Sequence, residues 1–263
     1  MLWGLRLNRL TILGSGASEG VPCLGCACRA CRSGVSRLRS SALIEWKGHH
    51  VLIDAGPDVR TQLLRAEVNR LDAVLLTHDH FDHIGGLEEL RPFSRKVPLP
   101  VYLSDFTLTL MKHRLHYLFK QHSSEVRKGS RTVGLEWIPV DNLSSSQEFD
   151  IGDLRVHYCS YRQGHSKVFG FRFGALAYMT DLRHDLENVV PFLRGVETLI
   201  LSAVSPYPTR MNLGLDEAVC LAKEVEAKNV YFTHISHEIC AESSPLPSHM
   251  RFAYDGLRIP FSQ

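Results

Sequence analysis

Residues 77–86 read THDHFDHIGG, and this stretch decides how the rest of the chain is interpreted. It follows the run LDAVLLTH (71–78), which is apolar on both faces as a buried strand would be. A polar turn needs one or two Asp or Gly residues, and three imidazoles packed together are unfavourable unless a bound group uses them. Imidazole nitrogens and carboxylate oxygens suit Zn, Mn or Fe, so the stretch predicts a metal site. Its candidate ligands are His78, Asp79, His80, Asp82 and His83.

Further apolar runs on both sides of this stretch predict a layered α/β protein. Short runs rich in Ile, Leu and Val, closed by Gly, Lys or Asp, are typical of strands, and longer runs with apolar residues at helical spacing are typical of helices. A helix should also begin within 85–91. We expect strands at 9–14, 41–46, 50–54, 98–104, 135–140, 154–159, 168–173, 175–180 and 229–233, and helices at 58–66, 105–120 and 215–227.

Length and charge set limits on the function. With 263 residues and 44% hydrophobic residues, the chain can bury a sizeable core, and we expect one domain over 1–263. A net charge of +2 demands neither a nucleic acid nor a membrane as partner. Residues 112–131 carry a basic run, opposed only by Glu125, which is either a solvated surface or a patch for phosphate-bearing substrates. The run comprises Lys112, Arg114, Lys120, Arg127, Lys128 and Arg131.

The ends and the cysteines favour a cytoplasmic, soluble protein. The first residues, MLWGLRLNRLTILGSG, are interrupted by Arg6 and Arg9 and lack a small-residue cleavage site, so they do not form a secretory signal. No segment approaches the roughly 20 apolar residues that a membrane span needs. Seven cysteines, four of them within 23–31, form an awkward disulfide set and suit a reducing compartment.

The cysteine-rich stretch GVPCLGCACRAC (20–31) predicts a second metal site. Cys26, Cys28 and Cys31 have the spacing C-x-C-x-x-C, and three thiolates need a fourth ligand to complete a tetrahedral zinc site. That ligand is either Cys23 or a histidine from elsewhere in the fold.

Five motifs in order along the chain resemble those of the metallo-β-lactamase superfamily. HDHFDH (78–83) is similar to the HxHxDH signature of that family. Asp54 in LIDAG resembles the first motif, His165 in GHS the third, Asp181 in MTD the fourth and His234 in FTHISH the fifth. The resemblance implies an αββα four-layer sandwich, in which two mixed sheets have helices on their outer faces.

The same resemblance implies two divalent metal ions, Mn or Zn, roughly 3.5 to 4 Å apart. Asp181 would bridge them. Asp54 would accept a hydrogen bond from a ligating imidazole, and Asp79 is left over and should point to solvent. Such a pair lowers the pKa of water toward about 7 and favours hydrolysis, with phosphodiesters fitting best. One ion would be held by His78, His80 and His165, and the other by Asp82, His83 and His234.

Within that superfamily, the cysteine loop resembles the loop of the PhnP-like phosphodiesterases, in which three cysteines and a histidine hold a structural zinc. The histidine there lies in a THISH segment, and this chain has the same string at 233–237. His237 therefore becomes the expected fourth ligand and Cys23 becomes spare. The segments RLRSSALI (37–44) and AYDG (253–256) are also similar to that group. The resemblance suggests manganese at the paired site and zinc on the cysteines.

One position departs from the pattern. Relatives of this kind carry a histidine where MNLGLDEA (211–218) has Asn212, and that histidine is thought to assist the leaving group or bind phosphate. Asparagine can donate a hydrogen bond but cannot give up a proton near pH 7. Either the substrate has a leaving group that needs no proton, or another residue such as His184 or Arg210 substitutes for the histidine, or catalysis has decayed. A general acid raises the rate by roughly 10²- to 10⁴-fold, so its loss would slow an enzyme without abolishing its activity. We therefore favour a working enzyme, with Asp82 and Asn212 as catalytic candidates.

The sequence thus predicts a metal-dependent phosphodiesterase acting on a small cyclic phosphate or nucleotide-like diester. A transfer-RNA 3′-processing endonuclease is the runner-up, because it would use the basic run at 112–131. A glyoxalase-type thioesterase shares HxHxDH but lacks the cysteine site, and a metal-binding protein without catalysis is the remaining alternative. A small substrate, no membrane and a possible homodimer are expected, with nucleic acid less favoured.

Overall fold

The computed structural model describes residues 8–122, 133–143, 147–239 and 244–262, which form two seven-stranded sheets. The first sheet has the strand order β14 (Arg258–Pro260), β1 (Arg9–Gly14), β2 (Ser41–Trp46), β3 (His49–Ile53), β4 (Ala73–Leu75), β5 (Leu99–Leu103) and β6 (Leu135–Pro139). The second has the order β13 (Met250–Phe252), β12 (Asn229–Thr233), β11 (Thr198–Ser202), β10 (Leu176–Met179), β9 (Ser166–Phe173), β8 (Leu154–Gln163) and β7 (Glu148–Ile151).

Each sheet is half antiparallel and half parallel, and the connections explain the division. Short turns join the antiparallel neighbours: β2 and β3 are linked by Lys47 and Gly48, both with positive φ, as a type I′ hairpin turn requires. Parallel neighbours need longer crossovers, which carry the helices. The parallel runs are β3 to β6 in the first sheet and β10 to β13 in the second.

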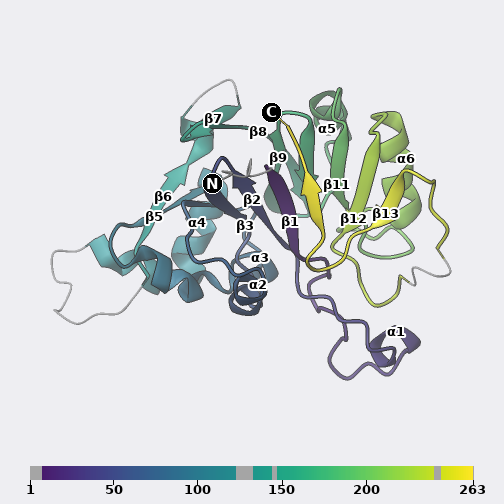
Figure 1. Ribbon diagram of the computed structural model, residues 1–263, viewed down its shortest axis with the longest axis horizontal. Coiled ribbons are helices and arrows are strands. Elements are labelled where there is room, and N and C mark those ends of the chain that lie inside the picture. Colours follow the sequence, from purple (N-terminus) through teal and green to yellow (C-terminus); the bar gives the residue numbers. More distant parts are fainter. Residues whose placement is uncertain (1–7, 123–132, 144–146, 240–243, 263) are drawn as a thin grey trace, which may run out of the picture.

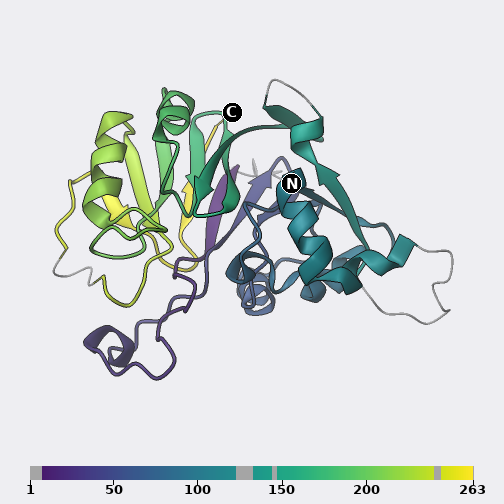
Figure 2. The ribbon, with the colours of Figure 1, turned by 180° about the vertical axis from the view of Figure 1, so that it is seen from behind.

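The helices cover the outer faces of the two sheets, and the molecule has four layers (Figure 1; Figure 2). Residues of both sheets, such as Ile44, Ile53, Phe169 and Phe171, form the core between them. Separate apolar clusters lie under the helices on each side. The first sheet is covered by α2 (Val59–Arg65), α3 (Phe81–Ile84), η1 (Leu87–Ser94), α4 (Asp105–Arg114) and η2 (His116–His122), and the second by α5 (Leu186–Leu193) and α6 (Leu215–Glu224).

The α4 helix shows how local sequence sets an element that reaches the site. The hydroxyl of Ser104 caps the helix by accepting a hydrogen bond from the Thr107 amide at 3.0 Å. Asp105 lies in the first turn, and Lys112, His113 and Arg114 lie in the last, where each charge complements the helix dipole. The helix therefore ends in a basic turn.

The four-layer α/β sandwich expected from the sequence is confirmed, and so is each of the expected strands, within a few residues. The helix expected over 105–120 is wrong in its second half, because α4 ends at Arg114 and η2 follows it as a 3₁₀ helix. The helix expected to begin within 85–91 is the 3₁₀ helix η1. Most of the loop expected at 121–132 lies outside the described residues. The sequence patterns did not predict β7, β11, β13, β14, α3, α5, the short 3₁₀ helix η3 (Val140–Asn142) or the single-turn helix α1 (Arg29–Arg32).

Two further features concern the chain as a whole. The segment that carries α1 extends away from the sandwich (Figure 1; Figure 2). Among the described helices, none has the length and apolar character that crossing a bilayer requires.

Candidate metal centres

The candidate site lies at one edge of the sandwich, where the carboxyl ends of parallel strands from both sheets meet. Asp54 follows β3, His78 follows β4, Asp181 follows β10 and His234 follows β12. Asp54, Asp181 and His234 have φ of 60°, 52° and 56°, a left-handed backbone that is uncommon for residues other than glycine. Such backbone costs on the order of 1–3 kcal/mol per residue and clusters at functional sites. The observed strain therefore points to function at this edge.

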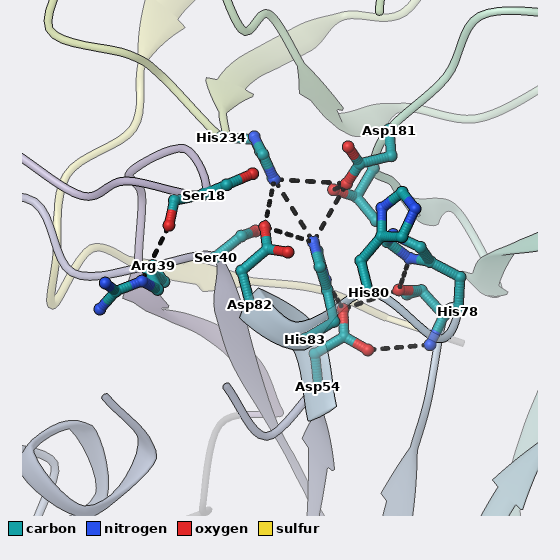
Figure 3. A network of polar contacts seen from close by, with 12 residues as sticks. Ser18, Arg39, Ser40, Asp54, His78, His80, Asp82, His83, Asp181 and His234 are labelled. Atoms are coloured by element: carbon teal, nitrogen blue, oxygen red, sulfur yellow. Dashed lines mark hydrogen bonds and ion pairs between the residues drawn. The ribbon is translucent and has the colours of Figure 1, made fainter. Parts of the chain in front are cut away.

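Imidazole and carboxylate atoms converge there (Figure 3). The Nε2 atom of His83 lies 3.2 Å from Oδ2 of Asp181 and 3.3 Å from Oδ2 of Asp82. The Nε2 atom of His234 lies 3.3 Å and 3.4 Å from the same two oxygens. In each of two groups the ligand atoms lie within 4.8 Å of one another, close enough to hold a metal ion: one group is His78, His83 and Asp181, and the other is Asp82, His83 and His234.

His78 gives the clearest sign that a metal fits this site. Its Nδ1 lies 2.9 Å from the hydroxyl of Thr77, but its fully buried Nε2 has no hydrogen-bond partner in the described structure. Leaving such a group unpaired costs on the order of 1–3 kcal/mol, and a metal ion at Nε2 would remove this cost. Burial lowers the pKa of His78 well below its ordinary value, and His83 adds to the effect. The neutral imidazole is the form that binds metal.

Asp54 fixes the orientation of His83, as the sequence analysis expected. Its carboxylate accepts hydrogen bonds of 2.8 Å from the backbone and from the hydroxyl of Thr77, and lies 2.7 Å from Nδ1 of His83. All three residues are completely buried. Because Nδ1 of His83 faces a carboxylate, its Nε2 faces the other ligand atoms, which is the arrangement found around ligating histidines.

The carboxylates of the site stay ionised. Burial acts to raise the pKa of Asp181, but His234 and His83 outweigh it and hold that pKa well below its ordinary value. Burial also acts to raise the pKa of Asp82, but His83 and His234 outweigh it and hold that pKa far below its ordinary value. Burial acts to lower the pKa of His83, and Asp54 and Asp82 outweigh it and raise the pKa well above normal. The two ionised carboxylates of Asp82 and Asp181 provide anionic oxygens, which suit cations, and a bound metal ion would displace the proton of His83.

Comparison with known proteins agrees with this geometry. A family model described as a beta-lactamase superfamily domain matches residues 49–235, which include all the residues of both groups. The chain belongs to the metallo-β-lactamase superfamily.

Among individual proteins, a diphosphatase from the PhnP family has a crystal structure that matches with a TM-score of 0.86 and 34% identity over 97% of both chains. The octanoyltransferase of Porphyromonas gingivalis is 32% identical over 259 residues, which is 95% of this chain and 51% of that protein. A ribonuclease Z of Bradyrhizobium (strain ORS 278) is 29% identical over 137 residues, 50% of this chain and 42% of that protein. The chain spans about half the length of these curated relatives.

Two histidines of the superfamily pattern lie outside both groups. His80 is half-buried, with its ring centroid 4.5 Å from that of His78 and its Nε2 3.3 Å from the Ser166 hydroxyl. His165 lies exposed in the turn between β8 and β9, directly before Ser166. The expectation that both hold the first ion with His78 stays a prediction.

The expectation that Asp79 points to solvent is wrong. The Asp79 side chain is fully buried, and its carboxylate forms an ion pair with Arg114 at the end of α4. Arg114 also donates to the backbone carbonyl of Asp79 at 3.1 Å. Packing of α4 on the sheet brings this cation over the metal-site loop, and the pairing offsets part of the cost of burying the carboxylate.

Asn212 lies half-buried at the edge of the site, where its amide meets a residue that the sequence analysis missed. Gln163, the last residue of β8, donates to Oδ1 of Asp181 at 2.6 Å and to Oδ1 of Asn212 at 2.9 Å. Other missed residues are Thr77, Ser166 and Thr180. All four lie one or two positions from a motif residue in the sequence. Polar residues next to the motifs could therefore have been predicted to belong to the site.

The structure brings three cysteines and His237 together in a second cluster, and their binding of zinc stays a prediction. The ligand atoms of Cys26, Cys28, Cys31 and His237 lie within 4.8 Å of one another. The Nδ1 atom of His237 is 3.5 Å from Sγ of Cys26 and 3.3 Å from Sγ of Cys28. A hydrogen bond from the Cys31 amide, together with His237, lowers the pKa of Cys28 to about 6. The thiolate form that zinc requires is thus favoured at this position.

Cys23 lies beside this cluster in a different chemical state. Its thiol donates to Oε2 of Glu19 at 3.2 Å, and this contact raises the pKa of Cys23 to about 11. Glu19, Cys23 and His237 also bring ligand atoms within 4.8 Å of one another. The Cys23 thiol is thus engaged by Glu19 and lies outside the four-ligand group, which agrees with Cys23 being spare.

Proposed function

We propose that this chain is a metal-dependent phosphodiesterase that hydrolyses small cyclic phosphates or nucleotide-like diesters. The observation that carries the proposal is the convergence of His78, His83 and Asp181 with Asp82 and His234 at one sheet edge. The likeness to a PhnP-family diphosphatase over 97% of both chains supports phosphorus as the centre that is attacked.

The residues would divide between two divalent ions, Mn or Zn. Asp82, His83 and His234 would hold one, His78 with His80 and His165 would hold the other, and Asp181 would lie between them. When bound, such a pair lowers the pKa of water toward about 7 and stabilises negative charge on the phosphoryl oxygens. Zinc would bind separately at Cys26, Cys28, Cys31 and His237, where it would tie the α1 segment to the loop after β12.

The protein's own groups would then orient the metal ligands and the attacking water. Asp54 holds the His83 imidazole with Nε2 toward the site. Asp82, whose side chain is 12% exposed, is a carboxylate of the site that solvent reaches, and it would orient the attacking water, whose proton would pass to solvent. The leaving oxygen would take its proton from solvent or from His184, because neither the amide of Asn212 nor the guanidinium of Arg210 can supply one.

The test combines elemental analysis per chain with hydrolysis of three substrates by metal-replete protein. A bis-aryl phosphate, a 2′,3′-cyclic nucleotide and a precursor transfer RNA distinguish the substrate classes. We expect three metal ions per chain and turnover of the first two substrates. The variant His83→Asn should lose both paired ions and all turnover, whereas His157→Asn, an exposed histidine of β8 paired with Glu148, should change neither. Metal-replete protein that cleaves no phosphodiester would reject the proposal and favour a non-catalytic metal-binding protein.

A transfer-RNA 3′-processing endonuclease is the second candidate, supported by the likeness to ribonuclease Z. Of the basic run, Lys112 and Arg114 are on α4, and Arg114 is engaged with Asp79. Arg127, Lys128 and Arg131 lie outside the described residues, as does the side chain of Lys120. RNA binding whose affinity falls steeply with salt concentration would favour this candidate, because each contact to a phosphate releases counterions from the RNA. Salt-independent turnover would favour a small substrate.

Octanoyl transfer is not proposed for this chain. About half of the Porphyromonas gingivalis protein lies outside the match, and the converging imidazoles and carboxylates here suit a metal-dependent hydrolase.

A further inference from the structure

Gln163 connects two elements of the site through a buried amide. Its side chain is 2% exposed at the end of β8. The Nε2 atom donates to Oδ1 of Asp181, which follows β10, at 2.6 Å and to Oδ1 of Asn212, which precedes α6, at 2.9 Å. One amide group therefore contacts both the expected bridging carboxylate and the residue that replaces the expected histidine.

The two oxygens of Asp181 have different surroundings. Oδ1 is bound by Gln163, whereas Oδ2 accepts a hydrogen bond of 2.9 Å from the Thr180 hydroxyl and faces Nε2 of His83 and of His234 at 3.2 Å and 3.3 Å. A carboxylate held from both sides cannot exchange its oxygens by rotation. Only Oδ2 is then presented to the ligand cluster.

Asn212 is held with its amide turned inward. Its backbone N–H donates to the Thr209 hydroxyl at 2.9 Å, and its carbonyl accepts from the Thr209 amide at 3.0 Å. With the amide rotated by half a turn, Asn212 would donate to Oδ1 of Asp181 at 3.2 Å. Either orientation connects Asn212 to Asp181, directly or through Gln163.

The backbone around these residues keeps the two elements in contact. Gly164 has a positive φ of 56°, and a Cβ at that position would lie 3.0 Å from Cε of Met211. The turn after Gln163 thus packs against the residue before Asn212. A side chain at 164 would displace the flexible end of Met211 and strain the left-handed backbone.

We propose that Gln163 and Asn212 form an amide pair that fixes the carboxylate of Asp181, so that Oδ2 alone faces the paired metal ions. In this inference, which rests on the proposed function, both are positioning residues, and Asn212 does not protonate the leaving group. An amide suits the task because it donates to a carboxylate without adding charge, whereas a carboxylate at 163 would repel Asp181.

The test replaces Gln163 by methionine, which keeps the length of the side chain and removes the donor. Gln62→Met is the matched control: Gln62 is also 2% exposed, donates once from Nε2, to the Arg39 carbonyl at 2.7 Å, and leaves its Oε1 unpartnered. Both variants should lose similar thermal stability, so a difference between them reports on the site and not on folding.

The first readout is metal binding without substrate, from chelator competition and from the electron paramagnetic resonance spectrum of Mn²⁺-loaded protein. Two Mn²⁺ ions that share a carboxylate oxygen give an exchange-coupled spectrum. We expect Gln163→Met to lose this coupled signal and bind metal about 10- to 100-fold more weakly, the usual range for residues that orient ligands, with Gln62→Met like the wild type. Wild-type spectrum and affinity in Gln163→Met would overturn the inference, and so would a wild type without a coupled pair.

The second readout separates positioning from proton donation. Asn212→Ala should slow the hydrolysis of aryl phosphodiesters with good and with poor leaving groups by the same factor, because no proton transfer is lost. A loss confined to poor leaving groups would overturn the inference. A wild type that shows the coupled pair but cleaves no phosphodiester would reject the proposed function and leave the metal-binding result standing.

Discussion

Arg114, the last residue of α4, forms an ion pair with Asp79 and also donates to the Asp79 backbone carbonyl at 3.1 Å. Asp79 stands between His78 and His80 in the metal-site loop, and its carboxylate is fully buried while the Arg114 side chain is 55% exposed. A helix from the outer layer thus supports the loop that carries two candidate ligands. The first prediction tests this support.

Arg114→Met should destabilise the metal-free protein by about 1–3 kcal/mol, because it leaves a buried carboxylate without its partner. Asp79→Asn should cost less, and the double variant should recover part of the loss. Urea unfolding of the three variants forms a double-mutant cycle that measures the coupling. Strictly additive losses would show that the pair contributes no coupling energy.

Asp54→Asn should weaken metal binding at the paired site about 10- to 100-fold, because the amide nitrogen of Asn cannot accept, so the three contacts that the two carboxylate oxygens make with Thr77 and His83 cannot all be kept. Asp255→Asn is the matched control. Asp255 also accepts three hydrogen bonds, from the amide and hydroxyl of Ser15 and the amide of Leu38, but contacts no candidate ligand. Chelator competition on both variants measures the effect. Equal affinities in the two variants would count against a specific role for Asp54.

Cys28→Ser should remove one zinc ion per chain and leave the paired ions in place, because the cysteine cluster is a separate four-ligand group. Cys23→Ser should keep all the metal, since the Cys23 thiol is bound to Glu19. Elemental analysis of both proteins after dialysis provides the measurement. Loss of zinc from Cys23→Ser would make Cys23 a ligand.

In metal-free protein, alkylation of Cys28 by iodoacetamide should follow the titration of its thiol. The pKa is lowered to about 6 by the Cys31 amide and by His237, so the rate should rise through pH 6 and level off by about pH 7.5. Cys23, with its pKa raised to about 11 by Glu19, should react slowly throughout this range. Mass spectrometry of timed samples separates the two sites. A midpoint for Cys28 near pH 9 would contradict the prediction.

His165→Asn should reduce the metal content from three ions to two and leave the ion at Asp82, His83 and His234. The reason is the place of His165: it precedes Ser166, whose hydroxyl lies 3.3 Å from Nε2 of His80, so the turn can bring its imidazole to the first ion. Elemental analysis is again sufficient. Full metal content would remove His165 from the ligand set.

The sequence by itself determined the parts of this protein that rest on local spacing. HDHFDH places candidate ligands directly after a buried strand. These residues lie near one another in space because they are close in sequence. Asp54 and His234 follow strands of different sheets, so the sequence placed them at one site only through the family resemblance. The spacing of the three cysteines predicted a metal site, and the resemblance predicted His237 as its fourth ligand.

Only the tertiary structure decided which partners distant residues meet. Arg114 lies 35 residues from Asp79, and Gln163 lies 18 residues from Asp181 and 49 from Asn212. Sequence spacing does not predict contacts over such separations. These contacts depend on how α4 packs on its sheet and on how the end of β8 meets the residue that follows β10. The short strands β13 and β14 escaped prediction for the same reason: each has three residues and forms only where a neighbouring strand offers an unpaired edge.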